Sequence, residues 1–164
     1  MKNLDEKNFS LKLFFATITL EMLKKYKVKE KIIIYSQGRN TSDKQAVAWL
    51  KIHGFDICEE KMHNLSKKNL LHILALTEGG FSDILKQRAG NGTDLKNKLE
   101  SVQSLSFNDS IEYIVKNTEV LKSPIIFGRN KLLVGFNAED IRKFIPQNYR
   151  KLAIKEINNK KSYN

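Results

Sequence analysis

Residues 32–59 contain a strand, a helix and a second strand in close succession. The run Ile32–Tyr35 is β-branched and aromatic and is followed by turn residues, which predicts a buried strand. Apolar residues at helical spacing between residues 46 and 50 predict a helix that ends at His53 and Gly54. The alternating segment Phe55–Glu59 predicts the second strand. Two strands joined by so short a crossover are typical of a parallel βαβ unit, which places the chain in the α/β class.

The rest of the chain adds helices and then an antiparallel pair of strands. Four helices are predicted, over residues 67–76, 81–88, 94–102 and 110–117. The strand Ser123–Phe127, a turn and the strand Leu132–Gly135 predict a hairpin. A last helix is predicted over residues 138–144, between a capping Asn137 and Pro146. This order of elements is the connectivity of a thioredoxin-like sheet with a helical insertion.

Charge is distributed unevenly along the 164 residues. The chain has 29 Lys and Arg against 18 Asp and Glu, a formal net charge of +11. Nearly all of the excess lies in residues 1–31 and 142–164, and the stretch between them is close to neutral. Basic ends around a balanced domain suit loose contact with a polyanion such as nucleic acid, and they equally suit solubility alone.

The most apolar stretch, Phe9–Leu23, is too short to cross a membrane. Lys12 and Glu21 interrupt it, whereas a spanning helix needs roughly 20 apolar residues. No small-residue cleavage site follows it, as a signal peptide would require. We therefore expect a helix that docks on the domain or on a partner, and no membrane association.

Cysteine and histidine are scarce, which limits the available chemistry. Cys58 is the only cysteine, so the chain has no intrachain disulfide, as suits a reducing cytoplasm. His53, Cys58 and His63 lack the spacing of a metal site. We expect no metal and no other cofactor.

The segment Ser123–Pro146, SPIIFGRNKLLVGFNAEDIRKFIP, resembles the C-terminal signature of the Spx and arsenate-reductase (ArsC-like) proteins. Further agreement comes from Tyr35–Ser36, Ala46, Ala48–Leu50 and Leu76–Gly80. The Spx branch is the closer match, over roughly residues 32–150. The resemblance implies an α/β, thioredoxin-like fold of the ArsC/Spx type with a helical insertion, and a structural cis bond before Pro124. Residues 1–31 would then be an extra N-terminal helix and residues 151–164 a basic tail.

The resemblance also shows which chemistry is missing. Redox-active relatives carry a Cys-x-x-Cys pair, or one nucleophilic cysteine, where this chain has Asn40 and Asp43. Arsenate reductases keep an arginine before the proline, where this chain has Ser123. Asn and Asp form neither a thiolate nor a disulfide. Cys58 falls on the predicted second strand, where we expect a buried structural cysteine. We interpret Asn40, Asp43 and Ser123 as a degenerate redox site and expect no enzymatic reduction.

Spx proteins are transcription regulators that bind the C-terminal domain of the α subunit of RNA polymerase. The resemblance implies that this contact centres on Gly80, with Glu78 and Gly79 beside it; the alternative interpretation of Gly80 is an ordinary helix C-cap. It also implies that Lys86 and Arg88 face promoter DNA, which would be bound only as part of that complex.

The sequence therefore predicts a cytoplasmic Spx-like regulator without a redox switch. Two alternatives stay open. One is a thioredoxin-like reductase of the arsenate reductase family, which the missing thiol disfavours. The other is an adaptor protein without catalytic activity that docks through residues 1–31.

Overall fold

The computed structural model describes residues 30–38, 40–88, 92–147, 151 and 155. The predicted N-terminal helix and most of the predicted basic tail lie outside the described residues. Within these ranges, no helix combines the length and the apolar character needed to cross a bilayer.

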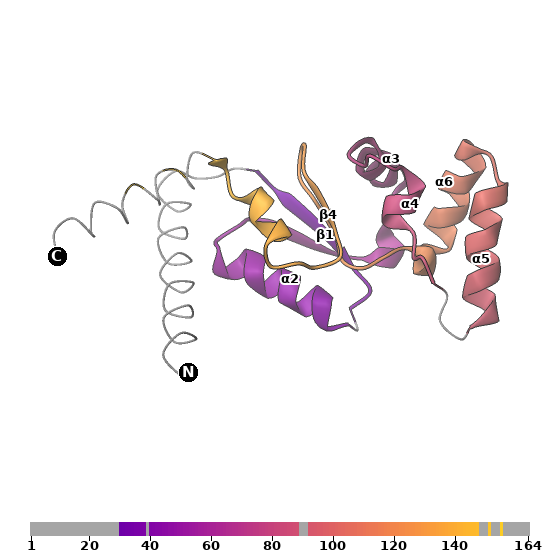
Figure 1. The fold of residues 1–164 in the computed structure, drawn as a ribbon, viewed down its shortest axis with the longest axis horizontal. Coiled ribbons are helices and arrows are strands. Elements are labelled where there is room, and N and C mark those ends of the chain that lie inside the picture. Colours follow the sequence, from indigo (N-terminus) through magenta and orange to yellow (C-terminus); the bar gives the residue numbers. More distant parts are fainter. Residues whose placement is uncertain (1–29, 39, 89–91, 148–150, 152–154, 156–164) are drawn as a thin grey trace.

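A four-stranded mixed sheet with the order β2-β1-β3-β4 forms the centre of the fold (Figure 1). Its strands are β1 (Ile32–Ser36), β2 (Ile57–Lys61), β3 (Ile125–Phe127) and β4 (Leu132–Val134). Strand β1 runs parallel to β2 and antiparallel to β3, and β3 pairs antiparallel with β4. Helix α2 (Thr41–Ile52) connects β1 to β2. The predicted βαβ unit and the predicted hairpin are therefore confirmed.

The two central strands, β1 and β3, are buried on both faces, whereas Glu59 and Lys61 of the edge strand β2 are exposed. Ile34 of β1 and Ile126 of β3 pack in one apolar cluster with α2 and with η3 (Asp140–Phe144). Their strand neighbours Tyr35 and Ile125 belong to a second cluster, formed with the helical region that follows β2. Successive side chains of a strand point to opposite faces, so one short apolar run supplies both clusters.

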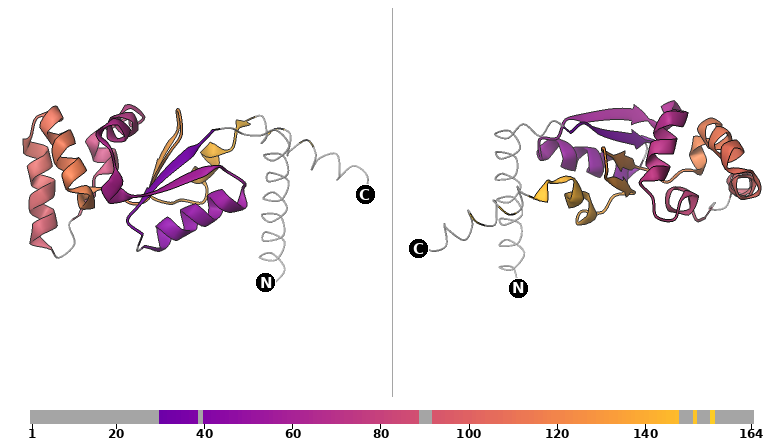
Figure 2. Two further views of the ribbon diagram at one scale, coloured as in Figure 1. Left: turned by 180° about the vertical axis from the view of Figure 1, so that it is seen from behind. Right: turned by 90° about the horizontal axis from the view of Figure 1, so that it is seen from above.

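The helical region gathers at one end of the molecule (Figures 1 and 2). It consists of η1 (Met62–Asn64), α3 (Lys67–Ala75), α4 (Phe81–Ile84), α5 (Thr93–Ser104), α6 (Phe107–Lys116) and η2 (Thr118–Val120). Polar side chains start several helices by accepting a backbone N–H of the first turn. Asn40 does so for α2, Ser66 for α3 and Ser106 for α6.

The helix predicted over residues 81–88 is wrong in length. It ends at Ile84, because Leu85 leaves the helix and forms an isolated bridge with Leu121. The amide of Lys86 donates to the carbonyl oxygen of Val120 (2.9 Å), and the amide of Lys122 donates to that of Ile84 (2.8 Å). These long-range bonds replace the helical ones.

Other boundaries also differ from the prediction, among them that of α6, which begins at Phe107 and not at residue 110. The last helix is a five-residue 3₁₀ helix, η3, and not an α-helix over residues 138–144. Asn137 accepts hydrogen bonds from the amides of Glu139 (2.8 Å) and Asp140 (3.2 Å), but Pro146 follows too soon for a longer helix. The second strand begins at Ile57, because the amide of Phe55 still bonds to the end of α2.

Ile126 tests the two-faced core. Its side chain is fully buried in the central strand β3, so Ile126→Ala should lower the free energy of unfolding by about 2–5 kcal/mol. Ile52 is a matched control because its side chain is 59% exposed, and Ile52→Ala should change the value by less than about 0.5 kcal/mol. Urea unfolding followed by circular dichroism measures both. Equal losses would contradict the assignment of Ile126 to the core.

Candidate functional site

The turn between α3 and α4 holds Gly80 at the protein surface. Gly80 is the N-cap of α4, with φ +66° and ψ −131°. Helix α3 already ends at Leu76, so the alternative interpretation of Gly80 as a helix C-cap is wrong. No atom of the described residues lies within 4 Å of the place a Cβ of Gly80 would take. The turn therefore requires glycine for its backbone angles, and the space beside Gly80 is open.

Asp83 fixes the shape of this turn. Its Oδ2 accepts hydrogen bonds from the amides of Glu78 (3.1 Å) and Gly79 (2.8 Å). The hydroxyl of Ser82 donates to the carbonyl oxygen of Gly79 (2.8 Å). A Cβ at Gly79 would lie 2.6 Å from Oδ1 of Asp83, so the two glycines have different reasons to be glycine. Asp83 was not predicted from the sequence, although an acidic residue in the first turn of a helix is a favourable position.

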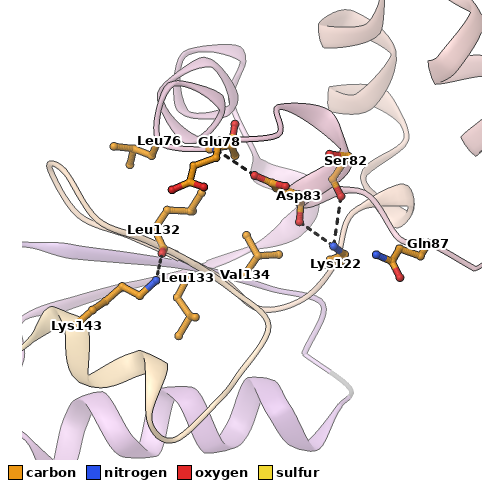
Figure 3. Close-up of a pocket in the computed structure, with 11 residues that line it drawn as sticks. Leu76, Glu78, Ser82, Asp83, Gln87, Lys122, Leu132, Leu133, Val134 and Lys143 are labelled. Atoms are coloured by element: carbon orange, nitrogen blue, oxygen red, sulfur yellow. Dashed lines mark hydrogen bonds between the residues drawn. The ribbon is translucent and has the colours of Figure 1, made fainter.

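A groove of about 490 Å³ lies between this turn and strand β4 (Figure 3). Leu76 and Glu78 line it on the side of the turn, and Leu132 and Val134 line it on the side of β4. The groove was not predicted from the sequence, because its two walls come from segments that are far apart in the chain.

Lys122 ties the turn region to the sheet at one end of the groove. Its ammonium donates to the carbonyl oxygens of Asp83 (2.9 Å) and Ser82 (3.4 Å). Figure 3 shows both contacts as dashed lines. The wall that carries Glu78 is thereby held against the start of the β3 region.

A second cluster of polar groups lies at the N-terminus of α2. The Oδ1 of Asn40 accepts a hydrogen bond from the amide of Asp43 (2.7 Å), and the amide of Gly38 donates to Oδ2 of Asp43 (2.9 Å). Asp43 is only 3% exposed. Gly38 has φ +77°, which allows the loop after β1 to fold back on this carboxylate.

Ser123, which lies just before the neighbouring strand β3, completes the cluster. Its hydroxyl donates to Oδ1 of Asp43 (2.6 Å) and accepts a hydrogen bond from the amide of Gln37 (3.1 Å). The peptide bond between Ser123 and Pro124 is cis. The structure thus brings Asn40, Asp43 and Ser123 together. Both carboxylate oxygens of Asp43 are occupied by donors, so this cluster ties loops together and offers no thiol for redox chemistry.

A family model described as the ArsC family matches residues 27–144, which is most of the chain. The chain belongs to the ArsC family. The sequence is 36% identical over 128 residues to the global transcriptional regulator Spx of Streptococcus pneumoniae, which covers 76% of this chain and 93% of that relative. It is 32% identical over 121 residues to the global transcriptional regulator Spx 2 of Bacillus cereus, which covers 73% and 90%. The Spx/ArsC resemblance is therefore confirmed.

Solved structures agree on the ArsC fold. An ArsC-family-related protein from Bacteroides fragilis matches with a TM-score of 0.56 at 18% identity, over 68% of this chain and 95% of that one. The predicted α/β, thioredoxin-like fold is confirmed.

The single cysteine of this ArsC-family chain lies away from the α2 corner. Cys58 is on β2 and pairs with Ile33, which is near the start of β1, whereas the corner follows the end of β1. Because each residue of a strand advances about 3.3 Å, Cys58 and the α2 corner lie about 10 Å apart along the sheet. Its Sγ lies 3.6 Å from Oε1 of Glu60. Cys58 is half-buried, so the expectation of a fully buried cysteine is wrong.

The two basic residues expected to face DNA differ in their surroundings. Lys86 is half-buried, and its ammonium donates to the carbonyl oxygen of Glu119 (2.8 Å). Burial lowers the pKa of Lys86, and the negative charge of Glu119 opposes this effect. Arg88 is exposed. Both residues follow α4 and do not lie on it.

A charge network beside Lys86 was missed by the sequence reading. Lys98 of α5 pairs with Glu119 (2.5 Å) and with Asp94 (2.9 Å). These hydrogen bonds raise the pKa of Lys98 above its usual value. Burial raises the pKa of Glu119, but the hydrogen bond from Lys98, a backbone hydrogen bond and the positive charge of Lys98 together outweigh burial, so the net pKa is lowered. Only the Asp94–Lys98 pair, four residues apart, could be expected from spacing.

The described residues contain no group of three or more His, Cys, Asp or Glu side chains able to hold a metal ion. His53 instead stacks on Trp49, with ring centroids 3.8 Å apart, and its Nδ1 lies 2.7 Å from the carbonyl oxygen of Trp49. Burial lowers the pKa of His53, the hydrogen bond to Trp49 partly opposes this, and Arg142 lowers it further. His53 therefore belongs to the end of α2.

Asp43→Ala tests the cluster at the α2 corner. It removes the carboxylate that accepts hydrogen bonds from Gly38 and Ser123, so it should lower the free energy of unfolding by about 1–3 kcal/mol. Lys44→Ala, at the exposed neighbouring position, should change it by less than about 0.5 kcal/mol. Chemical denaturation of both variants measures the difference. A fully stable Asp43→Ala protein would show that the cluster contributes nothing to the fold.

Proposed function

We propose that this chain is an Spx-like transcription regulator whose turn Glu78–Gly80 binds the C-terminal domain of the α subunit of RNA polymerase. The proposal rests on one observation above all: Gly80 is held at the surface by a fixed turn, with open space where a side chain would project. A partner surface can approach the backbone at such a position, whereas any side chain would hold it away. The relatives that share about a third of the sequence carry the name of global transcriptional regulators.

We propose further that this regulator works without a thiol switch and does not reduce arsenate. In the family, both activities depend on a cysteine after the first strand, where this chain has Asn40 and Asp43. The hydrogen bonds of Asp43 occupy this corner with a carboxylate that has no redox states. Cys58 is the only sulfur that could substitute as a nucleophile, and it lies on β2.

Promoter DNA enters the proposal only as part of the polymerase complex. Arg88 is the better candidate for a phosphate contact, because its guanidinium belongs to an exposed residue. The ammonium of Lys86 already donates to Glu119, so Lys86 would have to exchange this bond for a phosphate. Lys86 and Arg88 follow the Gly80 turn closely in the chain. The same polymerase–promoter complex could therefore contact the turn through its α subunit and the two basic residues through its DNA.

Gly80→Arg tests the polymerase contact. The backbone angles of Gly80 disfavour any side chain by about 1–3 kcal/mol, but no atom of the described residues blocks the arginine, so the variant should fold. Binding to the isolated polymerase domain, the C-terminal domain of the α subunit, should fall by at least about tenfold when it is measured by calorimetry.

Gly54→Arg is the matched control, because Gly54 has φ +73° and lies in the turn at the end of α2. It introduces the same charge and a similar backbone strain, and it should leave the affinity unchanged. If both variants bind like the wild-type protein, or if the wild-type protein does not bind at all, the proposed contact is wrong.

The absence of a thiol switch gives a second test. The affinity for the same polymerase domain should be equal, within about twofold, after treatment with diamide or with dithiothreitol, because the α2 corner contains no cysteine. Cys58→Ser should behave identically. A redox-dependent affinity that disappears in Cys58→Ser would transfer the switch to β2 and refute this part of the proposal.

A further inference from the structure

Strand β4 ends the sheet, and its outer edge carries free backbone groups. The hydrogen-bonded pairs at the two ends of the hairpin are Gly128 with Lys131 (2.9 Å) and Gly135 with Pro124 (2.7 Å). Bonded and non-bonded pairs alternate in an antiparallel ladder, so the backbone of Leu133 faces β3. The N–H and C=O groups of its neighbours on β4 therefore point away from the sheet.

Lys143 of η3 confirms this direction. Its ammonium donates to the carbonyl oxygen of Leu132 (2.8 Å), which Figure 3 shows at the rim of the groove. The described residues provide no hydrogen-bond partner for the amide of Val134. A lysine placed over an edge strand is a common protection against unwanted strand pairing. It leaves an edge that can still accept a strand, because an exposed lysine moves aside easily.

The two sides of this edge differ in chemistry. Leu132 and Val134 point to the side of the helical region, where Leu76 lines the groove. Leu133 points to the side of α2 and η3, where Lys143 lies. A strand added to β4 would therefore meet Leu76 together with polar side chains such as Glu78 and Ser82 on one face, and the ammonium of Lys143 on the other.

The ammonium groups around this edge lack acidic partners among the described residues. Lys122, Lys131 and Lys143 donate to backbone carbonyl oxygens, and none of them forms an ion pair with a described Asp or Glu. Lys131 and Lys143 lie on the η3 side and are complementary to carboxylates there, whereas Lys122 contacts α4. Since side chains alternate along a strand, the matching ligand alternates apolar and acidic residues.

We propose that the β4 edge and its groove bind an extended peptide segment of alternating apolar and acidic residues, which adds a fifth strand to the sheet. The peptide backbone bonds to Val134 and to the carbonyl oxygen of Leu132, and it displaces the ammonium of Lys143 onto a peptide carboxylate. The apolar residues enter the groove beside Leu76. This site adjoins the proposed polymerase contact, because Glu78 belongs to both, but its test uses no polymerase.

The test uses the full chain, labelled with ¹⁵N, and a short capped peptide of alternating valine and glutamate. The amides of Leu132 and Val134 should shift on titration, and their hydrogen exchange should slow by about tenfold or more at saturation. A peptide with lysine in place of glutamate should bind at least about fivefold more weakly. Equal binding of the two peptides, or shifts centred on the opposite edge β2, would overturn the proposal.

Two variants and one control separate the contribution of charge to peptide binding from that of the backbone hydrogen bonds. Lys143→Glu changes an exposed side chain, and it should weaken the glutamate peptide by about tenfold and make the lysine peptide the better ligand. Lys116→Glu, an equal charge change at the exposed end of α6, should change nothing. Val134→Pro removes the outward N–H together with the valine side chain and should abolish binding, with circular dichroism confirming the fold.

A second copy of this chain is the competing occupant. If the protein without peptide forms dimers at high concentration that already protect the amide of Val134, the edge pairs with itself and the peptide proposal is wrong. A monomer whose Val134 amide is protected only by the glutamate peptide supports it. Unchanged binding by Lys143→Glu would also overturn it, because the acidic half of the ligand would then have no counterpart.

Discussion

The burial of β1 and β3 on both faces is the constraint on which the rest of the structure depends. Ile34 and Ile126 require α2 and η3 on one side, and Tyr35 and Ile125 require the helical region on the other. Short strands with two apolar faces cannot remain in water, so the sequence must supply covering elements on both sides. Within the sheet, only the strand ends and the two edge strands then remain for contacts. The α2 corner lies at one strand end, and the groove lies along one edge.

The parts of the fold that were predicted correctly have local signals. The run Ile32–Tyr35 and the hairpin at residues 123–135 are both readable within a few positions. The helix over residues 81–88 failed for the opposite reason. Nothing near Leu85 shows that this residue pairs with Leu121, and this pairing ends α4 early.

The site shows the same division between local and long-range information. Position by position, the resemblance identified Asn40, Asp43 and Ser123 as places where reactive groups are absent. It did not show that Ser123 donates to Asp43 across 80 residues of chain, because that bond exists only once β3 lies beside β1. The glycines at 79 and 80 predicted a turn, but the carboxylate of Asp83 determines that the turn opens α4. Lys86 looked accessible in the sequence and is tied to Glu119 by folding.

A carboxylate cluster differs physically from a thiol pair because it has a single redox state. A dithiol can be oxidised to a disulfide, whereas the carboxylate of Asp43, which accepts from Gly38 and Ser123, takes no part in such an exchange. If the turn at Gly80 binds the polymerase, its affinity for the polymerase does not change with the redox state of the α2 corner. Regulation of this affinity would then require a second ligand. Glu78 lines the groove and also belongs to that turn, so a strand on β4 would lie next to a partner at Gly80. Glu78 is acidic and would repel carboxylates of a bound segment, whereas Lys143 on the η3 side would attract them. Only a segment with its carboxylates on the η3 side therefore avoids this repulsion. That requirement restricts the groove to alternating segments and excludes uniformly acidic ones.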